Sequence, residues 1–250
     1  MSHHLTDPSI DRGHRICLIG DSFGTQRIHD GDVEVAADCT WPQQIQRALP
    51  GMDVVCDFKP FRRLVECAEL LSERTDCELA IVQAGLVDCY PRPLPHGVSR
   101  SSHLACRVLR RCIRPVRRAW INYVYRTTWS SREELVLSIE ALLTQSPTRQ
   151  TGLVTAAPLL KEHAIYTPGA QEAVFEFNDL LREIVARCPR AFLIDLHAHV
   201  LAAGHRVLLS PWDSHLNQPG NDALAGLMLG EIRARVPTSA AAFPATRAAA

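Results

Sequence analysis

The segment Arg15 to Gly24 limits the possible fold more than any other stretch of the chain. Its apolar run, Ile16 to Ile19, is short and ends at Gly20, which is typical of a buried strand rather than of a helix. Gly20 allows the chain to turn sharply, and Asp21 and Ser22 follow at once. Ser22 is therefore predicted at the carboxyl end of the first strand, where open α/β sheets bind their ligands.

Strand and helix patterns alternate along the rest of the chain. Strand patterns occupy residues 15–20, 52–58, 78–84, 152–156 and 191–196, and helical patterns occupy about 41–49, 61–74, 131–146, 168–187 and 219–236. Thr40 is expected to cap the first helix, and Ser131 the third, in a capping box with Glu134. Residues 23–39 and 89–102 show no period and are predicted to be loops. The alternation predicts a single-domain, flavodoxin-like α/β/α fold of three layers, with a five-stranded parallel sheet of order 2-1-3-4-5.

Length and composition are those of one globular domain. The 250 residues suffice for a sizeable core, with residues 1–14 expected as a flexible arm, 15–236 as the domain and 237–250 as a disordered tail. The 27 basic and 27 acidic side chains cancel, so global charge points to no partner. The nine cysteines include no CxxC pair, and the sequence shows neither a secretory signal nor a membrane-spanning run. These features indicate a cytoplasmic protein with reduced thiols. The oligomeric state stays open.

Two motifs, one near each end of the chain, carry the chemistry. Residues 20–24, Gly-Asp-Ser-Phe-Gly, fit the G-x-S-x-G elbow of α/β-hydrolases, but that elbow follows several strands and this one closes the first. Gly-Asp-Ser is also a common turn. Residues 213–217, Asp-Ser-His-Leu-Asn, precede the last predicted helix. Together the two motifs resemble the first and last blocks of the SGNH, or GDSL-type, hydrolases, over about residues 15–236.

This resemblance implies catalysis by a serine nucleophile. Ser22 would attack a carbonyl carbon, His215 would take the serine proton, and Asp213 would orient the imidazole. In the family the Asp usually stands three residues before the His, whereas here it stands two before. The alternative for Asp213 is a loop residue that caps its own turn beside a surface histidine.

The blocks that supply oxyanion donors in the family are degenerate here. Residues 85–88, Gly-Leu-Val-Asp, resemble the block in which Gly-x-Asn-Asp is usual, and Val87 replaces the donor Asn. Losing one such donor costs on the order of 10²–10³ in rate. No Gly occurs in residues 57–66, so the backbone N–H of Phe61 or Arg62 is left for the second block. Candidates for oxyanion or substrate contacts are Asp21, Gly85, Asp88, Arg92 and Arg62.

An arginine-rich insert follows the third predicted strand. Residues 89–132 contain ten Arg and neither Asp nor Glu, and about 100–130 are predicted to be helical and divided by Pro115. One helix face is basic and the other apolar, and the insert could cover the active-site edge like a lid. The basic face would hold a phosphorylated or carboxylated substrate; the alternative is a solvated face packed by its apolar side. Arg92, just past Asp88, is the best single candidate for a site arginine. The basic face comprises Arg107, Arg110, Arg111, Arg114, Arg117 and Arg118, and the apolar face comprises Leu104, Val108, Leu109, Cys112, Ile113, Val116 and Trp120.

The sequence thus predicts an esterase, deacylase or acyltransferase with a Ser22 acyl-enzyme. Its partner would be a small-molecule ester or thioester, polar and, where the arginines bind it, anionic. The alternative is a catalytically degenerate binding protein that keeps the fold and binds an anion with the insert. No cofactor and no metal are expected, because His197 and His199 alone do not make a zinc site. Slight aromatic interleaving and zero net charge disfavour nucleic acid, and no membrane partner is expected.

Overall fold

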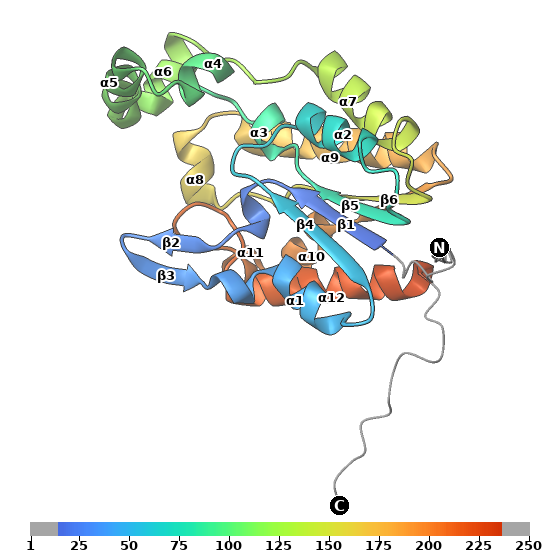
Figure 1. The fold of residues 1–250 in the computed structure, drawn as a ribbon. Coiled ribbons are helices and arrows are strands. Elements are labelled where there is room, and N and C mark those ends of the chain that lie inside the picture. Colours follow the sequence, from blue (N-terminus) through green and yellow to red (C-terminus); the bar gives the residue numbers. More distant parts are fainter. Residues whose placement is uncertain (1–14, 237–250) are drawn as a thin grey trace, which may run out of the picture.

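A five-stranded parallel sheet forms the centre of the molecule (Figure 1). The computed structural model describes residues 15–236, and the predicted arm and tail lie outside them. The sheet order is β4-β1-β5-β6-β7, which is 2-1-3-4-5 when these five strands are counted along the chain, so the predicted topology is confirmed. The strands are β1 (Arg15–Gly20), β4 (Asp53–Phe58), β5 (Leu79–Gln83), β6 (Gln150–Val154) and β7 (Ala191–Ile194).

Helices cover both faces of this sheet and complete the three layers (Figure 1). One face packs against α1 (Trp41–Ala48), α10 (Leu196–Ala203) and α12 (Gln218–Arg235). The other face packs against α2 (Leu64–Ser72), α7 (Arg132–Thr144) and α9 (Ala170–Ala186).

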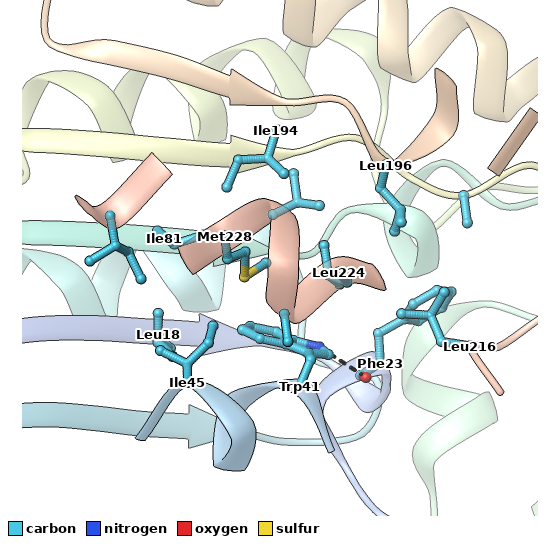
Figure 2. Packing of buried hydrophobic residues seen from close by; sticks show 14 of the residues in the cluster. Leu18, Phe23, Trp41, Ile45, Ile81, Ile194, Leu196, Leu216, Leu224 and Met228 are labelled. Carbon is cyan, nitrogen blue, oxygen red and sulfur yellow. Dashed lines mark hydrogen bonds between the residues drawn. The ribbon is translucent and has the colours of Figure 1, made fainter. Parts of the chain in front are cut away.

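The central strand β1 contributes to both cores. Ile16 and Leu18 belong to the cluster on the α1 and α12 side, whereas Cys17 and Ile19 belong to the cluster on the α2, α7 and α9 side. Successive side chains of a strand point to opposite faces, so a strand covered on both faces is a continuous apolar run. Figure 2 shows Leu18 among the helix residues Ile45, Trp41 and Met228 on the first side.

The stretch predicted as a loop over residues 23–39 contains a hairpin, so that prediction is wrong. After the short helix η1 (Ser22–Gly24), β2 (Arg27–His29) pairs antiparallel with β3 (Asp32–Val35), and η2 (Ala37–Cys39) follows. The turn residues Asp30 and Gly31 both have positive φ, 48° and 92°, as a two-residue hairpin turn requires. The strands are too short and too polar for a period-2 pattern to stand out.

Other differences from the predicted elements also have local causes. The loop predicted over 89–102 contains α4 (His96–Arg100), and α3 (Leu86–Cys89), α8 (Lys161–Tyr166) and α11 (His205–Leu208) are single turns that give little periodic signal. Helix α2 begins at Leu64 rather than at 61, because Phe61 has a positive φ of 61°.

The two predicted caps differ in outcome. The capping box of α7 is confirmed, since Ser131 Oγ accepts from the Glu134 N–H at 3.2 Å and the Glu134 carboxylate accepts from the Ser131 N–H at 2.8 Å. Thr40 stands at the N-cap position of α1, but its hydroxyl donates to the Ala37 carbonyl instead of capping the helix.

Two features bear on the predicted compartment. Cys17 and Cys77 form a disulfide, with their Cα atoms 6.1 Å apart, so the expectation of reduced thiols is wrong for this pair. The other seven cysteines are free. Within residues 15–236, every helix is too short or too polar to cross a membrane.

Candidate active site

Ser22 lies where β1 ends, as the sequence predicts. Gly20 is required there, because a Cβ at this position would come 2.5 Å from the Gln83 carbonyl oxygen and 2.7 Å from the Phe58 ring. Asp21 then caps η1, and its Oδ1 accepts from the Phe23 N–H at 3.0 Å. Asp21 is buried, and burial raises its pKa to about 6.

The structure brings Ser22, His215 and Asp213 into one row. Ser22 Oγ lies 2.9 Å from His215 Nε2, although 193 residues separate them in the chain. His215 Nδ1 lies 3.0 Å from Asp213 Oδ1, an ion-pair distance, but the ring is turned so that Nδ1 makes no hydrogen bond within the described residues. The same Oδ1 accepts from the His215 backbone N–H at 3.2 Å. The order hydroxyl, imidazole, carboxylate is that of a serine nucleophile with its base and orienting acid.

Arg27 of the hairpin is a fourth member of this row that the sequence did not reveal. Its Nη2 pairs with Asp213 Oδ2, so β2 supplies a cation to the orienting carboxylate. On the same hairpin, Glu34 accepts from the Ser210 hydroxyl at 3.0 Å, and His29 stacks on Trp212 at 4.4 Å between ring centroids. The hairpin therefore supports the whole loop that carries Asp213 and His215. Asp30-Gly31 is the sequence signal that predicts such a turn.

The electrostatic surroundings keep the His215 imidazole neutral. Burial, followed by the charge of Arg27, lowers the pKa of His215 to about 4, while Asp21 and Glu34 oppose the shift. The Phe23 ring packs 4.8 Å from the imidazole and contributes to that burial. A neutral Nε2 is the form that can accept a proton from Ser22 at neutral pH.

The loop of His215 is also tied to the segment before α8. Ser214 has a positive φ of 59°, and its Oγ accepts from the Leu160 N–H at 3.1 Å. Ser214 Oγ also lies 2.5 Å from His163 Nδ1, and His163 Nε2 lies 3.1 Å from the Pro211 carbonyl oxygen. The carbonyl can only accept, so Nε2 carries the proton and Nδ1 accepts from the Ser214 hydroxyl.

The backbone N–H groups of Ser22 and Phe61 have no acceptor within residues 15–236, and those of Leu86 and Val87 have none either. The Arg62 N–H, by contrast, donates to the Lys59 carbonyl at 3.1 Å. Phe61 and Val87 line the same cavity as Ser22. Phe61 has the left-handed conformation that glycine adopts most easily, at the place where the family block has glycine.

The structure does not bring Arg62, Asp88 or Gly85 to the cavity wall, so the predicted oxyanion or substrate contacts are not seen there. The buried Arg62 guanidinium donates to the Asp57 carboxylate at 2.6 Å and to the Gly20 carbonyl at 3.4 Å. Gly85 has a φ of 109°, and a Cβ there would strike the Phe177 ring.

Asp88 is engaged in holding neighbouring segments together. Its carboxylate accepts from the Leu64 N–H at 2.9 Å, from Ser130 Oγ at 2.6 Å and from Arg63 Nε at 3.1 Å. Burial raises the pKa of Asp88, although these hydrogen bonds act to lower it. Its contacts fix the start of α2 and the chain before α7.

A cavity of about 300 Å³ opens beside Ser22 and His215. Three other residues of the predicted site, Asp21, Asp213 and Arg92, also line this cavity. Arg117 of the insert lines it as well. His163 and Tyr166 close another part of the wall. The cavity therefore combines a hydroxyl that is hydrogen-bonded to an imidazole with two guanidinium groups.

The insert consists of α4, α5 (Leu104–Ile113), η3 (Arg114–Val116) and α6 (Arg117–Tyr123), and stands beside the sheet on the side of α8 and the hairpin (Figure 1). The predicted division at Pro115 is confirmed. In the alternative given above, the apolar face of the insert packs against the rest of the domain and the basic face is solvated. The structure differs from that alternative. Most of the apolar face is exposed, namely Leu104, Val108, Leu109, Cys112 and Val116, whereas Arg110, Arg114 and Arg117 line hollows in the surface.

Within residues 15–236, no three His, Cys, Asp or Glu side chains are grouped so that they could hold a metal ion. His197 is buried and contacts the Phe175 ring.

Comparisons with known proteins place this fold. No family model and no curated protein matches the sequence. Among solved structures, a lipase/acylhydrolase from Enterococcus faecalis superposes with a TM-score of 0.57 at 17% identity, covering 90% of this chain and 97% of that chain. A member of the lipolytic protein G-D-S-L family from Veillonella parvula DSM 2008 superposes with a TM-score of 0.57 at 15% identity, covering 89% of this chain and 100% of that chain. An acetylxylan esterase from Geobacillus stearothermophilus superposes with a TM-score of 0.57 at 16% identity, covering 88% of this chain and 94% of that chain. The chain therefore has the fold of the GDSL, or SGNH-type, hydrolases, as its first and last motifs predict.

Proposed function

We propose that the protein cleaves carboxylic esters or thioesters through a Ser22 acyl-enzyme. The observation that carries the proposal is the row Ser22 Oγ, His215 Nε2 and Asp213, with 2.9 Å from hydroxyl to imidazole and 3.0 Å from imidazole to carboxylate. The solved structures with this fold include proteins described as an acylhydrolase and as an acetylxylan esterase, which supports the same class of reaction here.

In the first half of the reaction, Ser22 Oγ attacks the carbonyl carbon while its proton passes to His215 Nε2. The negative charge that develops on the carbonyl oxygen is stabilised by the Ser22 and Phe61 N–H groups, which have no other acceptor within the described residues. When the tetrahedral intermediate collapses, the bond to the leaving group breaks, and the leaving alcohol or thiol takes the proton from His215. Asp213, held by Arg27, keeps the imidazole in place.

In the second half, the incoming nucleophile attacks the carbonyl carbon of the acyl-enzyme while its proton passes to His215. The bond from that carbon to Ser22 Oγ then breaks, and Oγ takes the proton from His215, which restores Ser22. Water gives net hydrolysis, and an alcohol or amine gives acyl transfer. Both outcomes use the same residues, so the acceptor alone distinguishes an esterase or deacylase from an acyltransferase.

A binding protein without catalysis is the second candidate, and one observation favours it. Val87 lines the Ser22 cavity, and its side chain has no group that could donate to an oxyanion. Such a protein would keep the fold and bind an anion with the arginines of the insert.

Intact-mass spectrometry after incubation with a fluorophosphonate separates the two candidates. An activated Ser22 is expected to give one adduct that Ser22→Ala abolishes and His215→Gln slows by at least 10²-fold. Ser72→Ala, which changes an exposed serine at the end of α2, is expected to react like the wild type. A folded wild type that takes up no label would exclude the acyl-enzyme and favour the binding protein.

The acceptor is tested by the products of p-nitrophenyl acetate turnover. If water is the acceptor, acetate forms in step with nitrophenol, and added glycerol leaves the acetate yield unchanged. Acetyl glycerol that forms at the expense of acetate would instead assign transfer.

A further inference from the structure

The cavity of Ser22 adjoins two larger hollows in the surface of the insert. A hollow of about 520 Å³ shares Phe61, Arg92 and Arg117 with the Ser22 cavity. A second hollow, of about 1020 Å³, shares Arg117 and Tyr166 with it. Arg117 thus lies on the wall of all three spaces, and both hollows exceed the roughly 300 Å³ around Ser22.

Some arginines of these hollows are already used by the protein. Arg110 donates to the carbonyl oxygens of Val98, Ser99 and Ser101 at 2.8 to 3.1 Å, which ties α5 to α4. Arg100 lies 3.6 Å from the Glu66 carboxylate.

The other arginines of the hollows are different, because in the described part of the chain none of them pairs with a carboxylate and none donates its side chain to a backbone carbonyl. They are Arg92, Arg111, Arg114, Arg117 and Arg118. Arg117 makes one hydrogen bond, from Nε to Thr167 Oγ1 at 3.3 Å. Five guanidinium groups therefore line the hollows without a paired carboxylate in the described residues, and those of Arg92 and Arg117 also line the Ser22 cavity.

Arg92 is the most informative of the five. Its guanidinium carbon lies 4.5 Å from the centroid of the Trp129 ring and 5.0 Å from that of Tyr90, and its Nε is buried without an acceptor within residues 15–236. Burial, and then the charge of Arg117, lower the pKa of Arg92 to about 10, which still leaves it protonated at neutral pH. A buried cation is costly unless an anion accompanies it, and two adjacent cations increase that cost. Within residues 15–236, no carboxylate forms an ion pair with Arg92 or Arg117 at this junction.

We propose that Arg92, Arg117 and Arg114 bind a phosphate or diphosphate group of the substrate while its ester or thioester carbonyl lies at Ser22. This inference rests on the proposed function and adds the substrate class: an acylated organic phosphate whose larger part occupies the hollows of the insert. Planar guanidinium groups bind phosphate oxygens through paired hydrogen bonds, and several arginines match the multiple charges of a diphosphate better than a single carboxylate.

Calorimetric titration with inorganic diphosphate tests the anion site without any turnover. The wild type and Ser22→Ala are expected to bind it equally, and Arg117→Gln and Arg114→Gln each to weaken binding at least tenfold. Arg107→Gln is the matched control, because Arg107 is an exposed arginine of α5 outside both hollows, and it is expected to change binding less than twofold. Arg92→Gln perturbs a buried stacked residue, so Arg117→Gln decides the question.

The proposal is overturned if diphosphate binds no better than sodium chloride of equal ionic strength. It is also overturned if Arg107→Gln weakens binding as much as Arg117→Gln does. Protection of Ser22 supports it: saturating diphosphate should slow fluorophosphonate labelling of the wild type at least fivefold and leave the labelling of Arg117→Gln unchanged.

The failures of the two proposals are distinguishable. Diphosphate binding that depends on Arg117, in a protein whose Ser22 takes no label, would keep the anion site and reject the hydrolase. Labelling of Ser22 without diphosphate binding would keep the hydrolase and reject the anion site. Co-sedimentation with phosphatidylglycerol vesicles but not with phosphatidylcholine vesicles, lost in Arg117→Gln, would assign the phosphate to a lipid headgroup; a protein that stays in solution would assign it to a soluble phosphate.

Discussion

At the scale of single residues, Arg27 sets the working range of the proposed base. It pairs with the carboxylate that faces His215, and its charge is the largest electrostatic contribution to the lowered pKa of that histidine after burial. Protonation of His215 removes the lone pair that accepts the Ser22 proton, so activity is lost as pH falls through the pKa of about 4. We therefore expect kcat/KM for a neutral ester to be level from pH 7 to about pH 5 and to fall tenfold per unit well below pH 4.

Arg27→Gln removes the positive charge and leaves the full charge of Asp213 to act on the imidazole. The pKa of His215 then rises, and the acid limb of kcat/KM moves to higher pH, so at pH 5 the variant loses more of its pH 7 activity than the wild type does. The pH profile of p-nitrophenyl acetate hydrolysis measures this shift. Arg47→Gln, at an exposed position of α1, controls for a general change in charge. An acid limb that stays in place or moves lower would contradict the role of Arg27.

Val87 limits the proposed reaction at the same scale. It lines the Ser22 cavity where the family has an Asn donor, and a single oxyanion donor contributes on the order of 10²–10³ in rate. Val87→Asn is expected to raise kcat for a neutral ester at least tenfold, because its amide N–H can reach the developing oxyanion. Val87→Leu matches the size of Asn without a donor and is expected to be no faster than the wild type. Equal rates for the Asn and Leu variants would show that Val87 lies outside the oxyanion site.

At the scale of elements, the β2–β3 hairpin is a support for the site rather than part of the core. It contacts the loop of His215 through Arg27, Glu34 and His29, and its strands stand outside the main sheet. Segments with few buried apolar contacts open at lower free energy than the core does. Damage to the hairpin should therefore affect Ser22 before it affects global stability.

Gly31→Ala tests this separation. Gly31 has a φ of 92°, and no heavy atom lies within 4 Å of a Cβ built there, so the variant changes only backbone strain, by about 1 kcal/mol. We expect faster amide hydrogen exchange in β2 and β3 and slower fluorophosphonate labelling, with Tm lowered by no more than about 2–4 °C. Gly226→Ala in α12 also meets open space but has helical geometry, so it should raise stability by about 0.5–1 kcal/mol and leave exchange in the hairpin unchanged. Uniformly faster exchange throughout the sheet of Gly31→Ala would refute the separation.

At the scale of the whole molecule, the sequence predicts what local patterns determine and misses what tertiary contact determines. Strands buried on both faces are continuous apolar runs, so the five strands of the sheet and their order could be predicted. Ser22 directly follows the first strand and His215 closely precedes the last helix, each in a short motif, so both could be predicted as well. The contact of Arg27 with Asp213 could not, because it joins a three-residue strand to a loop 186 residues away. The orientation of the insert was equally hidden, since an amphipathic pattern does not say which face packs against the body.

The core beneath α1 and α12 also reaches the site, through Trp41. Figure 2 shows its indole Nε1 donating to the Phe23 carbonyl, at 3.1 Å, one residue beyond Ser22. Trp41→Phe removes that donor and leaves a buried carbonyl unpaired, in addition to the loss of ring area, which should lower the free energy of unfolding by about 2–3 kcal/mol. Because the Phe23 carbonyl then loses its hydrogen-bond donor, we also expect labelling of Ser22 to slow severalfold at temperatures where the variant is fully folded.

Ile45→Val is the control, since Ile45 lies in the same cluster but makes no hydrogen bond to the site. It should lower the free energy of unfolding by about 1 kcal/mol and leave the labelling rate unchanged. Denaturant unfolding and labelling rates are measured on both variants. If both variants lose labelling in proportion to their loss of stability, the core acts on Ser22 only through global unfolding. A loss of labelling confined to Trp41→Phe shows instead that this hydrogen bond positions the turn that carries Ser22.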